Sequence, residues 1–467
     1  MSEVKVNKIS PRSGTEVTLG DSGDTFTIPS GATINNQGTA TNFGATGSAS
    51  WVTTVKTSTF TAVAGEGYFV NTTGGVVSVN LPAGTAGAVV AIKDYAGTFD
   101  TNNVTLVQNG SDKIGGSTDN SILSTEGIAV TLVFVDSTQG WLVTDSGLQD
   151  EAPGPEFITA TGGTITTVCT NFKVHTFTGP GTFCVSNGGN AAGSNKVDYL
   201  VVAGGGGGAG HYGAGGGAGG YRESPGTASG SYTVSPLGAS PAVALPVSVQ
   251  GYTVTVGGGG AGGAKVCGPT GCGTSGSNST FSTIISTAGG GGGNGTSSAP
   301  QANASPGGSG GGGGSYGPNN AGTGGTGNTP AVTPAQGTNG GNGNRCSGTH
   351  TAGGGGGGAT VAGQNAGGCG QGGPSYGSGG AGATSSINAT PTARAGGGGG
   401  SQNSTPTNPV GGVGGGGLGG SPGNTSAPTV QGTVNTGGGA GGINGNNPMP
   451  AGGTGGSGIV IIRYKFQ

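Results

Sequence analysis

Runs of glycine fill the last two-thirds of this 467-residue chain and limit what it can fold into. Glycine accounts for 119 residues, whereas only 30% of the chain is hydrophobic and 7% is charged. This composition excludes an ordinary globular enzyme built around one large apolar core. Collagen is excluded as well, because glycine does not recur at every third position and proline is sparse. The main runs are 204–208, 213–220, 257–263, 289–293, 307–314, 353–358, 396–400, 411–420, 437–442 and 452–458.

Such runs can be ordered only if they pack against one another. In the polyproline-II conformation the backbone turns once every three residues, rises about 3.1 Å per residue and directs its N–H and C=O groups sideways. An isolated run should stay disordered, because fixing each residue costs about 1–2 kcal/mol and glycine loses the most freedom. Runs without Cβ atoms can approach closely enough to exchange amide hydrogen bonds, each contributing about 0.5–1.5 kcal/mol. The sequence therefore predicts a layered bundle of polyproline/polyglycine-II helices, with Val413 and Leu418 facing outward or against a sheet.

Short β-strands are expected elsewhere, so the predicted fold class is all-β. A β-rich shaft segment covers 1–50, a small β-sandwich-like domain 51–149, a linker 150–160 and the glycine-rich domain 161–467. Apolar residues that alternate with polar ones between turn signals predict an antiparallel sandwich or barrel over 51–149. Its expected strands are 52–56, 68–70, 76–81, 88–93, 104–108, 128–136 and 141–144.

Apolar strands also frame the glycine-rich domain. Three strands that should form a meander or hairpin are 164–169, 172–178 and 182–185. Two stronger candidates are VDYLVVA (197–203), which runs into the first glycine run, and IVIIRYKF (459–466), which follows the last one. We expect 459–466 to pair with 197–203, so that both ends of the glycine region share one sheet.

The segments between the runs are rich in Ser, Thr, Asn and Pro, the residues of ordered turns. Consecutive runs should alternate in direction, so these connections emerge at two ends of the bundle, and one end can face a target. Tyr and Arg are favoured at contact surfaces, although packing over the bundle ends explains each of them equally well. The candidate receptor contacts are His211, Tyr212, Tyr221, Arg222, Tyr316, Asn319, Asn320, Arg345, His350, Tyr376 and Arg394, of which Tyr316, Asn319, Asn320 and Tyr376 are favoured.

The chain carries no pattern that indicates catalysis, a cofactor or a metal. Its formal net charge of −3 offers no basic surface for nucleic acid. It contains no apolar stretch long enough for membrane insertion, and its start does not resemble a signal peptide. His175, His211 and His350 lie far apart in the sequence without neighbouring carboxylates, and His175 sits in a strand pattern typical of a structural residue. Acidic residues are nearly absent after Glu223, which argues against a glycosidase.

The six cysteines allow several pairings, and the simplest joins neighbours in the sequence. These pairs are Cys169 with Cys184, Cys267 with Cys272, and Cys346 with Cys369. Each disulfide would stabilise the fold by about 2–4 kcal/mol and would fit a protein that matures outside the reducing cytosol. Zinc is the rival interpretation, disfavoured because no paired C-x-x-C units occur.

The order of several phrases resembles a known kind of protein. VHTFTGPGTFCV, VDYLVVAGGGGG, GGGAGGYR, YTVTVGGGG and GGSGIVIIRYKF are similar to the glycine-rich domain of tail-fibre proteins of tailed bacteriophages, especially marine ones. The earlier phrases KVNKISPRSGT, GDTFTIPSGATI and AIKDYAGTFDTNNVTL resemble the N-terminal parts of such proteins. The bundle also resembles the polyglycine sandwich of T-even-type phage adhesins, in which loops at the distal tip bind the receptor.

This resemblance implies a virion protein of the tail fibre, extracellular after host lysis. It implies a homotrimer in the N-terminal parts, contacts with other tail or baseplate proteins through the N-terminus, and attachment to a receptor on the host surface. A purely structural fibre or connector is the first alternative. An ice-binding protein is the second, disfavoured because it needs a flat face from a strict Gly-x-x repeat.

Overall fold

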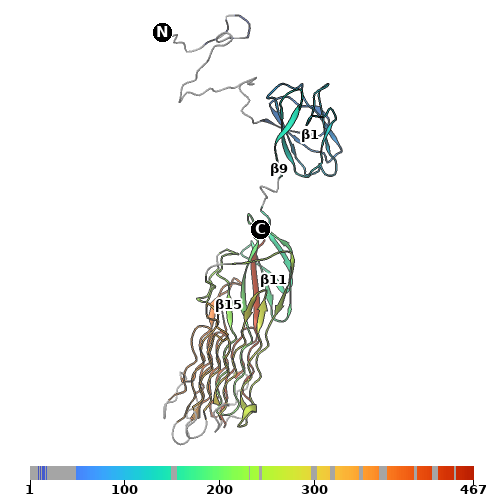
Figure 1. Ribbon diagram of the computed structural model, residues 1–467. Coiled ribbons are helices and arrows are strands. Elements are labelled where there is room, and N and C mark those ends of the chain that lie inside the picture. The colour runs from blue at the N-terminus through green and yellow to red at the C-terminus, as the bar shows by residue number, and fades with distance from the viewer. Residues whose placement is uncertain are drawn as a thin grey trace. The chain divides into compact units, whose positions relative to one another are not determined.

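The computed structural model describes residues 49–148 and 155–467, except 231, 241–243, 296–301, 316–320, 346–350, 368–375, 404–406, 423–429 and 446–448; before residue 49 it describes only 9, 11, 13–15 and 17. The chain divides into two compact units, Met1–Pro153 (unit 1) and Gly154–Gln467 (unit 2) (Figure 1). Apart from the single-turn 3-10 helix η2 (Pro269–Gly271), the named elements are β-strands, which confirms the all-β prediction. No described helix has the length and apolar character needed to cross a bilayer.

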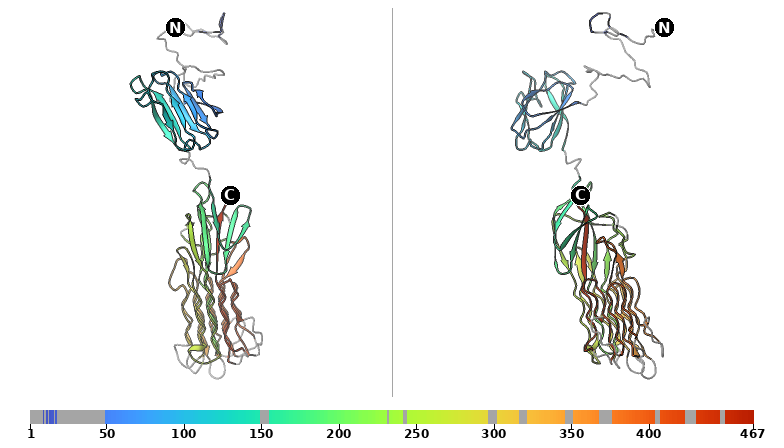
Figure 2. Two further views of the ribbon diagram at one scale, coloured as in Figure 1. Left: turned by 90° about the vertical axis from the view of Figure 1, so that its right-hand side faces the viewer. Right: turned by 180° about the vertical axis from the view of Figure 1, so that it is seen from behind.

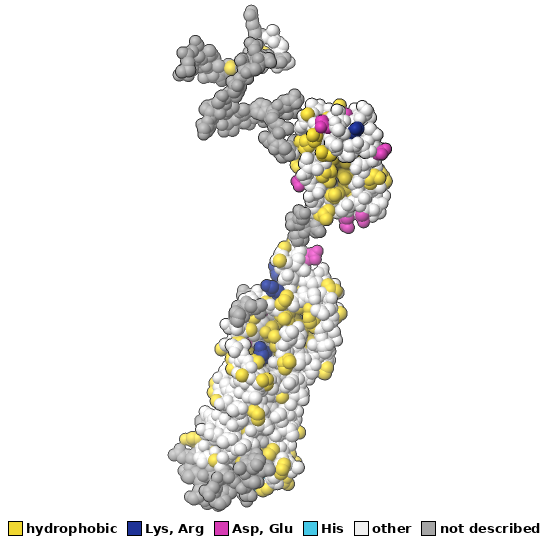
Figure 3. All heavy atoms as spheres, viewed as in Figure 1, with side chains coloured by type: hydrophobic (Ala, Val, Ile, Leu, Met, Phe, Trp, Pro, Cys, Tyr) yellow, Lys and Arg dark blue, Asp and Glu magenta, His cyan; other side chains and the backbone are white. Residues whose placement is uncertain are grey.

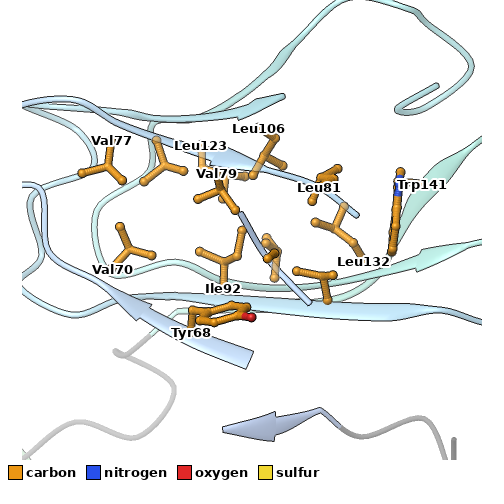
Figure 4. Packing of buried hydrophobic residues seen from close by; sticks show 14 of the residues in the cluster. Tyr68, Val70, Val77, Val79, Leu81, Ile92, Leu106, Leu123, Leu132 and Trp141 are labelled. Carbon is orange, nitrogen blue, oxygen red and sulfur yellow. The ribbon is translucent and has the colours of Figure 1, made fainter. Parts of the chain in front are cut away.

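Unit 1 is a two-sheet sandwich. One sheet has the order β1-β3-β5-β8-β9 and the other β2-β4-β6-β7. The strands are β1 (Ser50–Lys56), β2 (Phe60–Thr61), β3 (Glu66–Val70), β4 (Val77–Asn80), β5 (Val89–Asp94), β6 (Val104–Val107), β7 (Ser121–Leu123), β8 (Ala129–Phe134) and β9 (Trp141–Gly147). Between the sheets lies an apolar core that includes Tyr68, Val79, Ile92, Leu106 and Trp141 (Figure 4).

The sandwich of unit 1 is not antiparallel throughout, contrary to the sequence prediction. The first six strands alternate between the two sheets, so β1, β3 and β5 are parallel neighbours in one sheet and β2, β4 and β6 are parallel neighbours in the other. Each short turn reverses the chain and also moves it to the opposite sheet, which brings every second strand back in the same direction. Only the last strands pair antiparallel, as in β5–β8 and β8–β9.

Unit 2 begins with a second sandwich. One sheet has the order β10-β13-β17-β18-β19 and the other β11-β12-β24-β14-β15, with β16 beside β14. The strands are β10 (Ile158–Thr161), β11 (Thr164–Val168), β12 (Phe172–Phe177), β13 (Gly181–Gly188), β14 (Lys196–Val202), β15 (Tyr221–Glu223), β16 (Leu245–Pro246), β17 (Gln250–Thr255), β18 (Ser279–Phe281), β19 (Ile284–Ser286) and β24 (Ile459–Lys465). Phe183, Val254 and Phe281 of the first sheet pack against Val201 and Ile462 of the second.

The predicted pairing of the last strand is confirmed. β24 lies antiparallel to β14, with Val202 opposite Ile459 and Leu200 opposite Ile461. Both strands are buried on their two faces, because the face turned away from the sandwich core is covered by residues such as Ala359 and Ile387. Continuous apolar runs are what such doubly buried strands require. The expected meander is wrong in one strand: β11 and β12 form a hairpin, but β13 crosses to the other sheet.

Below these sheets the glycine-rich segments run side by side (Figures 1 and 2). In the segment 204–210, residues 204, 207 and 210 donate backbone hydrogen bonds to one neighbour, 271–277. Residues 205 and 208 donate to 453–456, and residues 206 and 209 donate to 214–217. The donor numbers rise by three while the acceptor numbers fall by three, so these neighbours run antiparallel. A repeat of three residues is the periodicity of the threefold extended helix.

Carbonyl groups of the same segment accept from three further neighbours, which run parallel to it. They are 260–263, 289–292 and 440–443. Six neighbours around one segment make a hexagonal arrangement, and this close approach requires glycine. A Cβ on Gly206, for example, would lie 2.1 Å from the carbonyl oxygen of Gly290. The predicted layered bundle is therefore held by mutual amide hydrogen bonds, and Val413 faces outward with 71% exposure.

Several bundle segments are not glycine runs, and two of them, 322–327 and 430–433, were predicted to be loops. They include 271–277, 322–327, 337–343, 361–366 and 430–433, and they lie at the outside of the bundle. An outer segment needs a small residue only where it faces inward. In 451–458 the residues Ala451, Thr454 and Ser457, spaced by three, are the ones that are not fully buried.

Two short hairpin pairs complete the bundle. β20 (Asn344–Arg345) pairs with β21 (Thr351–Ala352), and β22 (Ala383–Ser385) pairs with β23 (Thr392–Arg394).

Candidate functional site at the distal end of the bundle

The glycine bundle has a β-sheet end and an opposite end, called the distal end below. Both termini of unit 2 lie at the β-sheet end, where the ammonium of Lys465 lies 5.3 Å from the ring of Phe157. β14 continues into segment 204–210, the chain turns at His211–Tyr212, and segment 213–220 returns to β15. The His211–Tyr212 turn therefore lies at the distal end, away from the residues that join unit 2 to the rest of the chain.

Segment 213–220 is the centre of the bundle at this end. It exchanges backbone hydrogen bonds with six neighbours: 206–209, 290–293, 309–312, 354–357, 398–401 and 440–443. At the distal end each neighbour is bordered by a polar residue, and these residues form a collar around the central turn. The collar consists of Asn294, Ser315, Thr351, Ser401 and Asn444, and His211 of the turn itself borders the sixth neighbour.

The collar is closely packed. Asn294, Ser315 and Asn444 have no exposed surface, and the Oγ atoms of Ser315 and Ser401 are buried without a protein partner. The side-chain amide of Asn444 donates to the carbonyl of Gln402 at 2.8 Å. Because these residues end the segments around 213–220 with polar groups, they mark the distal limit of the hydrogen-bonded glycine bundle there.

Two predicted contact residues, His211 and Tyr212, form the central turn. Their rings meet edge to face with centroids 4.6 Å apart. Tyr212 has a φ of 42°, a left-handed conformation that is uncommon for a bulky residue and marks a constrained turn. Gly445 lies directly against both rings, because a Cβ there would be 2.9 Å from the ring of Tyr212. The two side chains are half-buried.

Two further predicted contacts are placed at the same end. Tyr376 is 40% exposed, and the adjoining Gly377 accepts a hydrogen bond from Gly400, next to Ser401 of the collar. The backbone of Arg345 pairs with Thr351 of the collar. Tyr316, Asn319, Asn320 and His350 lie outside the described residues.

Three predicted contacts lie instead at the β-sheet end, opposite the distal turn. Tyr221 and Arg394 are buried, with 1% and 4% exposure, so neither can touch a receptor, and Arg222 pairs with Val201 within a sheet. The reason is the direction of the chain, since every second segment returns to the sheets. Tyr221 donates to Glu223 at 3.1 Å. Burial raises the pKa of the Glu223 carboxyl and lowers the pKa of the Arg394 guanidinium.

His175 is structural, in agreement with its strand position. Its Nδ1 lies 2.7 Å from the carbonyl oxygen of Gly162, and its Nε2 lies 3.1 Å from the hydroxyl of Tyr464. Burial lowers the pKa of this imidazole and favours its neutral form.

Among the described cysteines, the two expected disulfides Cys169–Cys184 and Cys267–Cys272 are not formed. Cys169 lies in the turn between β11 and β12, whereas Cys184 lies on β13, which belongs to the opposite sheet; both are exposed free thiols. Cys267 is also a free thiol, and its Sγ lies 3.5 Å from Nδ1 of His211. Cys346 and Cys369 lie outside the described residues. The described part of the chain holds no group of three or more His, Cys, Asp or Glu side chains placed to bind a metal ion.

This architecture, β-sheets that continue into a hydrogen-bonded glycine bundle with polar turns at its free end, defines the class of protein. The chain belongs to the glycine-rich domain family, whose model matches residues 178–465. Residues 17–148 match the model of the N-terminal part of a bacteriophage T4 gp9/10-like protein. Together the two matches support a phage tail-fibre-like protein, a component of the virion tail. No curated protein matches the chain.

Proposed function

We propose that this protein is a tail-fibre adhesin that binds a receptor on the host cell surface through the distal end of its glycine bundle. The main support for this proposal is the position of the His211–Tyr212 turn and of Tyr376. They lie at the end of unit 2 opposite its two termini. A unit attached to a fibre through its N-terminal side presents that end outward. The likeness to the polyglycine sandwich of T-even-type adhesins supports the same orientation.

One side of the bundle supports this choice, because several of its backbone amides are already occupied. The N–H of Gly324 donates to Oδ1 of Asn342 at 2.9 Å, and that of Gly327 donates to Oδ1 of Asn339 at 2.9 Å. The N–H of Asn342 donates in turn to Oδ1 of Asn365 at 2.8 Å. Side chains thus cap an outer row of backbone donors, which discourages another chain from adding to the lattice. In the face shown in Figure 3 the bundle presents mainly polar and backbone atoms with scattered hydrophobic side chains.

Binding of the labelled full chain to bacterial cells tests the proposal, with the strain on which the phage grows set beside resistant strains. We expect saturable binding to the sensitive strain only. Tyr376→Ala should weaken it at least about tenfold, the size of effect typical of an aromatic contact residue. Tyr95→Ala is the matched control, since Tyr95 is 58% exposed in unit 1 and should have no effect. Equal binding to sensitive and resistant cells would exclude the adhesin.

A structural fibre or connector remains the second candidate. It predicts that particles lacking the chain fail to assemble a complete tail, while the chain itself binds no cells. The implied homotrimer, the attachment through the N-terminal region and the absence of enzymatic activity stay predictions.

A further inference from the structure

An exposed thiol and an imidazole from separate parts of the sequence meet at the distal end. Sγ of Cys267 lies 3.5 Å from Nδ1 of His211, although the residues are 56 positions apart. The same Nδ1 lies 3.3 Å from the carbonyl oxygen of Gly295. Nδ1 of His211 therefore lies within 3.5 Å of one sulfur and one carbonyl oxygen.

These separations match the edges of a tetrahedral metal site. A zinc ion lies about 2.3 Å from sulfur and about 2.0–2.1 Å from nitrogen or oxygen, which at tetrahedral angles places S and N about 3.5 Å apart and N and O about 3.4 Å apart. We propose that Cys267, His211 and the Gly295 carbonyl bind one zinc-class divalent ion. Thiolate and imidazole select such a soft to intermediate metal over Mg²⁺ or Ca²⁺, which prefer oxygen ligands.

The three ligand atoms are held in place by the fold. The side-chain amide of Asn294 donates to the carbonyls of Val266 and Gly268, on either side of Cys267, at 2.9 and 3.0 Å. The N–H of Gly295 donates to the carbonyl of His211 at 2.7 Å. Asn294 is fully buried and its Oδ1 has no protein partner, so an unused oxygen donor lies at the same junction.

The site is an open one. Among the described residues no third cysteine, histidine or carboxylate joins the set, and the proposed site takes water as its fourth ligand, an arrangement common in zinc sites that are not purely structural. On binding, the Cys267 thiol releases its proton to solvent, and the resulting thiolate and the neutral Nδ1 each donate an electron pair to the ion. No oxidation is involved. The ion would join the central turn to the loop that follows segment 257–263.

The reduced full chain titrated with Co²⁺ tests the site. We expect one equivalent to produce a thiolate-to-metal absorption band that Zn²⁺ removes by displacement. Cys267→Ser should abolish the band, and His211→Gln should weaken Zn²⁺ binding at least about tenfold. Cys184→Ser is the matched control, because Cys184 is an exposed thiol on β13 and its loss should leave the band unchanged.

Three results would overturn the proposal: no band in the native chain, which indicates a simple hydrogen-bonded thiol–imidazole pair; a band that survives in Cys267→Ser; or a band lost in Cys184→Ser. Unchanged amide exchange of segment 204–220 in each variant shows that the bundle is folded. Cell binding is not the readout, so the metal site and the adhesin proposal stand or fall separately.

Discussion

Two glycine-to-alanine substitutions in the same bundle should have opposite effects on the stability of unit 2. A Cβ on Gly216, in the central segment, would lie 2.1 Å from the carbonyl oxygen of Gly206, where real contacts begin at 3.0 Å or more. A Cβ on Gly258, in an outer segment, meets nothing within 4 Å. Only the first substitution has to push neighbouring segments apart.

The magnitude follows from the bonds that this separation disturbs. Gly216 donates to Ala440 at 2.8 Å and accepts from Gly398 at 2.9 Å, while Gly206 donates to Gly217 at 2.8 Å and accepts from Ala440 at 3.0 Å. At about 1 kcal/mol net for each bond, weakening three of the four lowers the free energy of unfolding by about 3 kcal/mol. Gly258→Ala should instead raise it by about 0.5 kcal/mol, because alanine restricts the unfolded chain.

Scanning calorimetry of the full chain measures both effects. For a unit of this size, about 3 kcal/mol corresponds to a fall in Tm of about 5 °C in the transition of unit 2, whereas Gly258→Ala should shift that transition upward by about 1 °C. Amide exchange assigns the transition, since Gly216→Ala should expose segment 204–220 selectively. Equal Tm changes for the two variants would refute the argument that interior segments are held by contact through absent side chains.

Two further predictions concern single residues of unit 2. Asn342→Ala should speed exchange of the Gly324 amide and cost about 1 kcal/mol, whereas Asn342→Asp, which keeps the acceptor oxygen, should protect that amide; equal exchange in both variants would contradict the capping role. Burial holds the pKa of His175 below its ordinary value of 6.5, so the unfolded chain binds the proton more readily; the contribution of His175 to stability is complete above pH 6.5 and is lost as pH falls below it. Denaturant unfolding across this pH range should show that the free energy of unfolding falls more steeply with acid in the native chain than in His175→Gln. Parallel pH profiles for the two chains would contradict this role of His175.

Much of the architecture could be predicted from the residues. The pairing of β14 with β24 follows from two continuous apolar runs at the borders of the glycine region, since only strands covered on both faces need that pattern. The bundle could be predicted because an isolated glycine run loses too much conformational entropy to be ordered, so ordered runs must pack against one another. Outer segments such as 337–343 were not predicted, because their polar residues have the composition of turns. The signal was present in the spacing: Asn339 and Asn342 are three residues apart, one turn of the extended helix.

The candidate site was predicted only in part. Tyr221 was assigned to a contact surface from its residue type alone. Segment 204–210 runs from the sheets to the distal end, so segment 213–220 must run back and end at the sheets. Following the direction of the two segments would have placed Tyr221 at the β-sheet end. The proximity of Cys267 to His211 had no sequence signal, since it depends on which segments become neighbours in the hexagonal lattice.

The side chains at the ends of the glycine segments fix the register of those segments, which the glycine residues alone leave open. A slip of one segment by three residues restores every backbone bond between glycines, so the lattice alone leaves the register of each segment undetermined. Side chains at the two ends remove that freedom. At the β-sheet end, Ala203 and Ala395 are fully buried in a fitted apolar layer, and at the distal end Asn294 and Ser315 are buried in the polar collar. A slip would place an apolar residue from one end, or a collar residue from the other, at positions now held by glycines such as Gly206, where a Cβ would lie 2.1 Å from a carbonyl oxygen. The collar therefore fixes where the segments around 213–220 end, and a tip that recognises a partner depends on those positions.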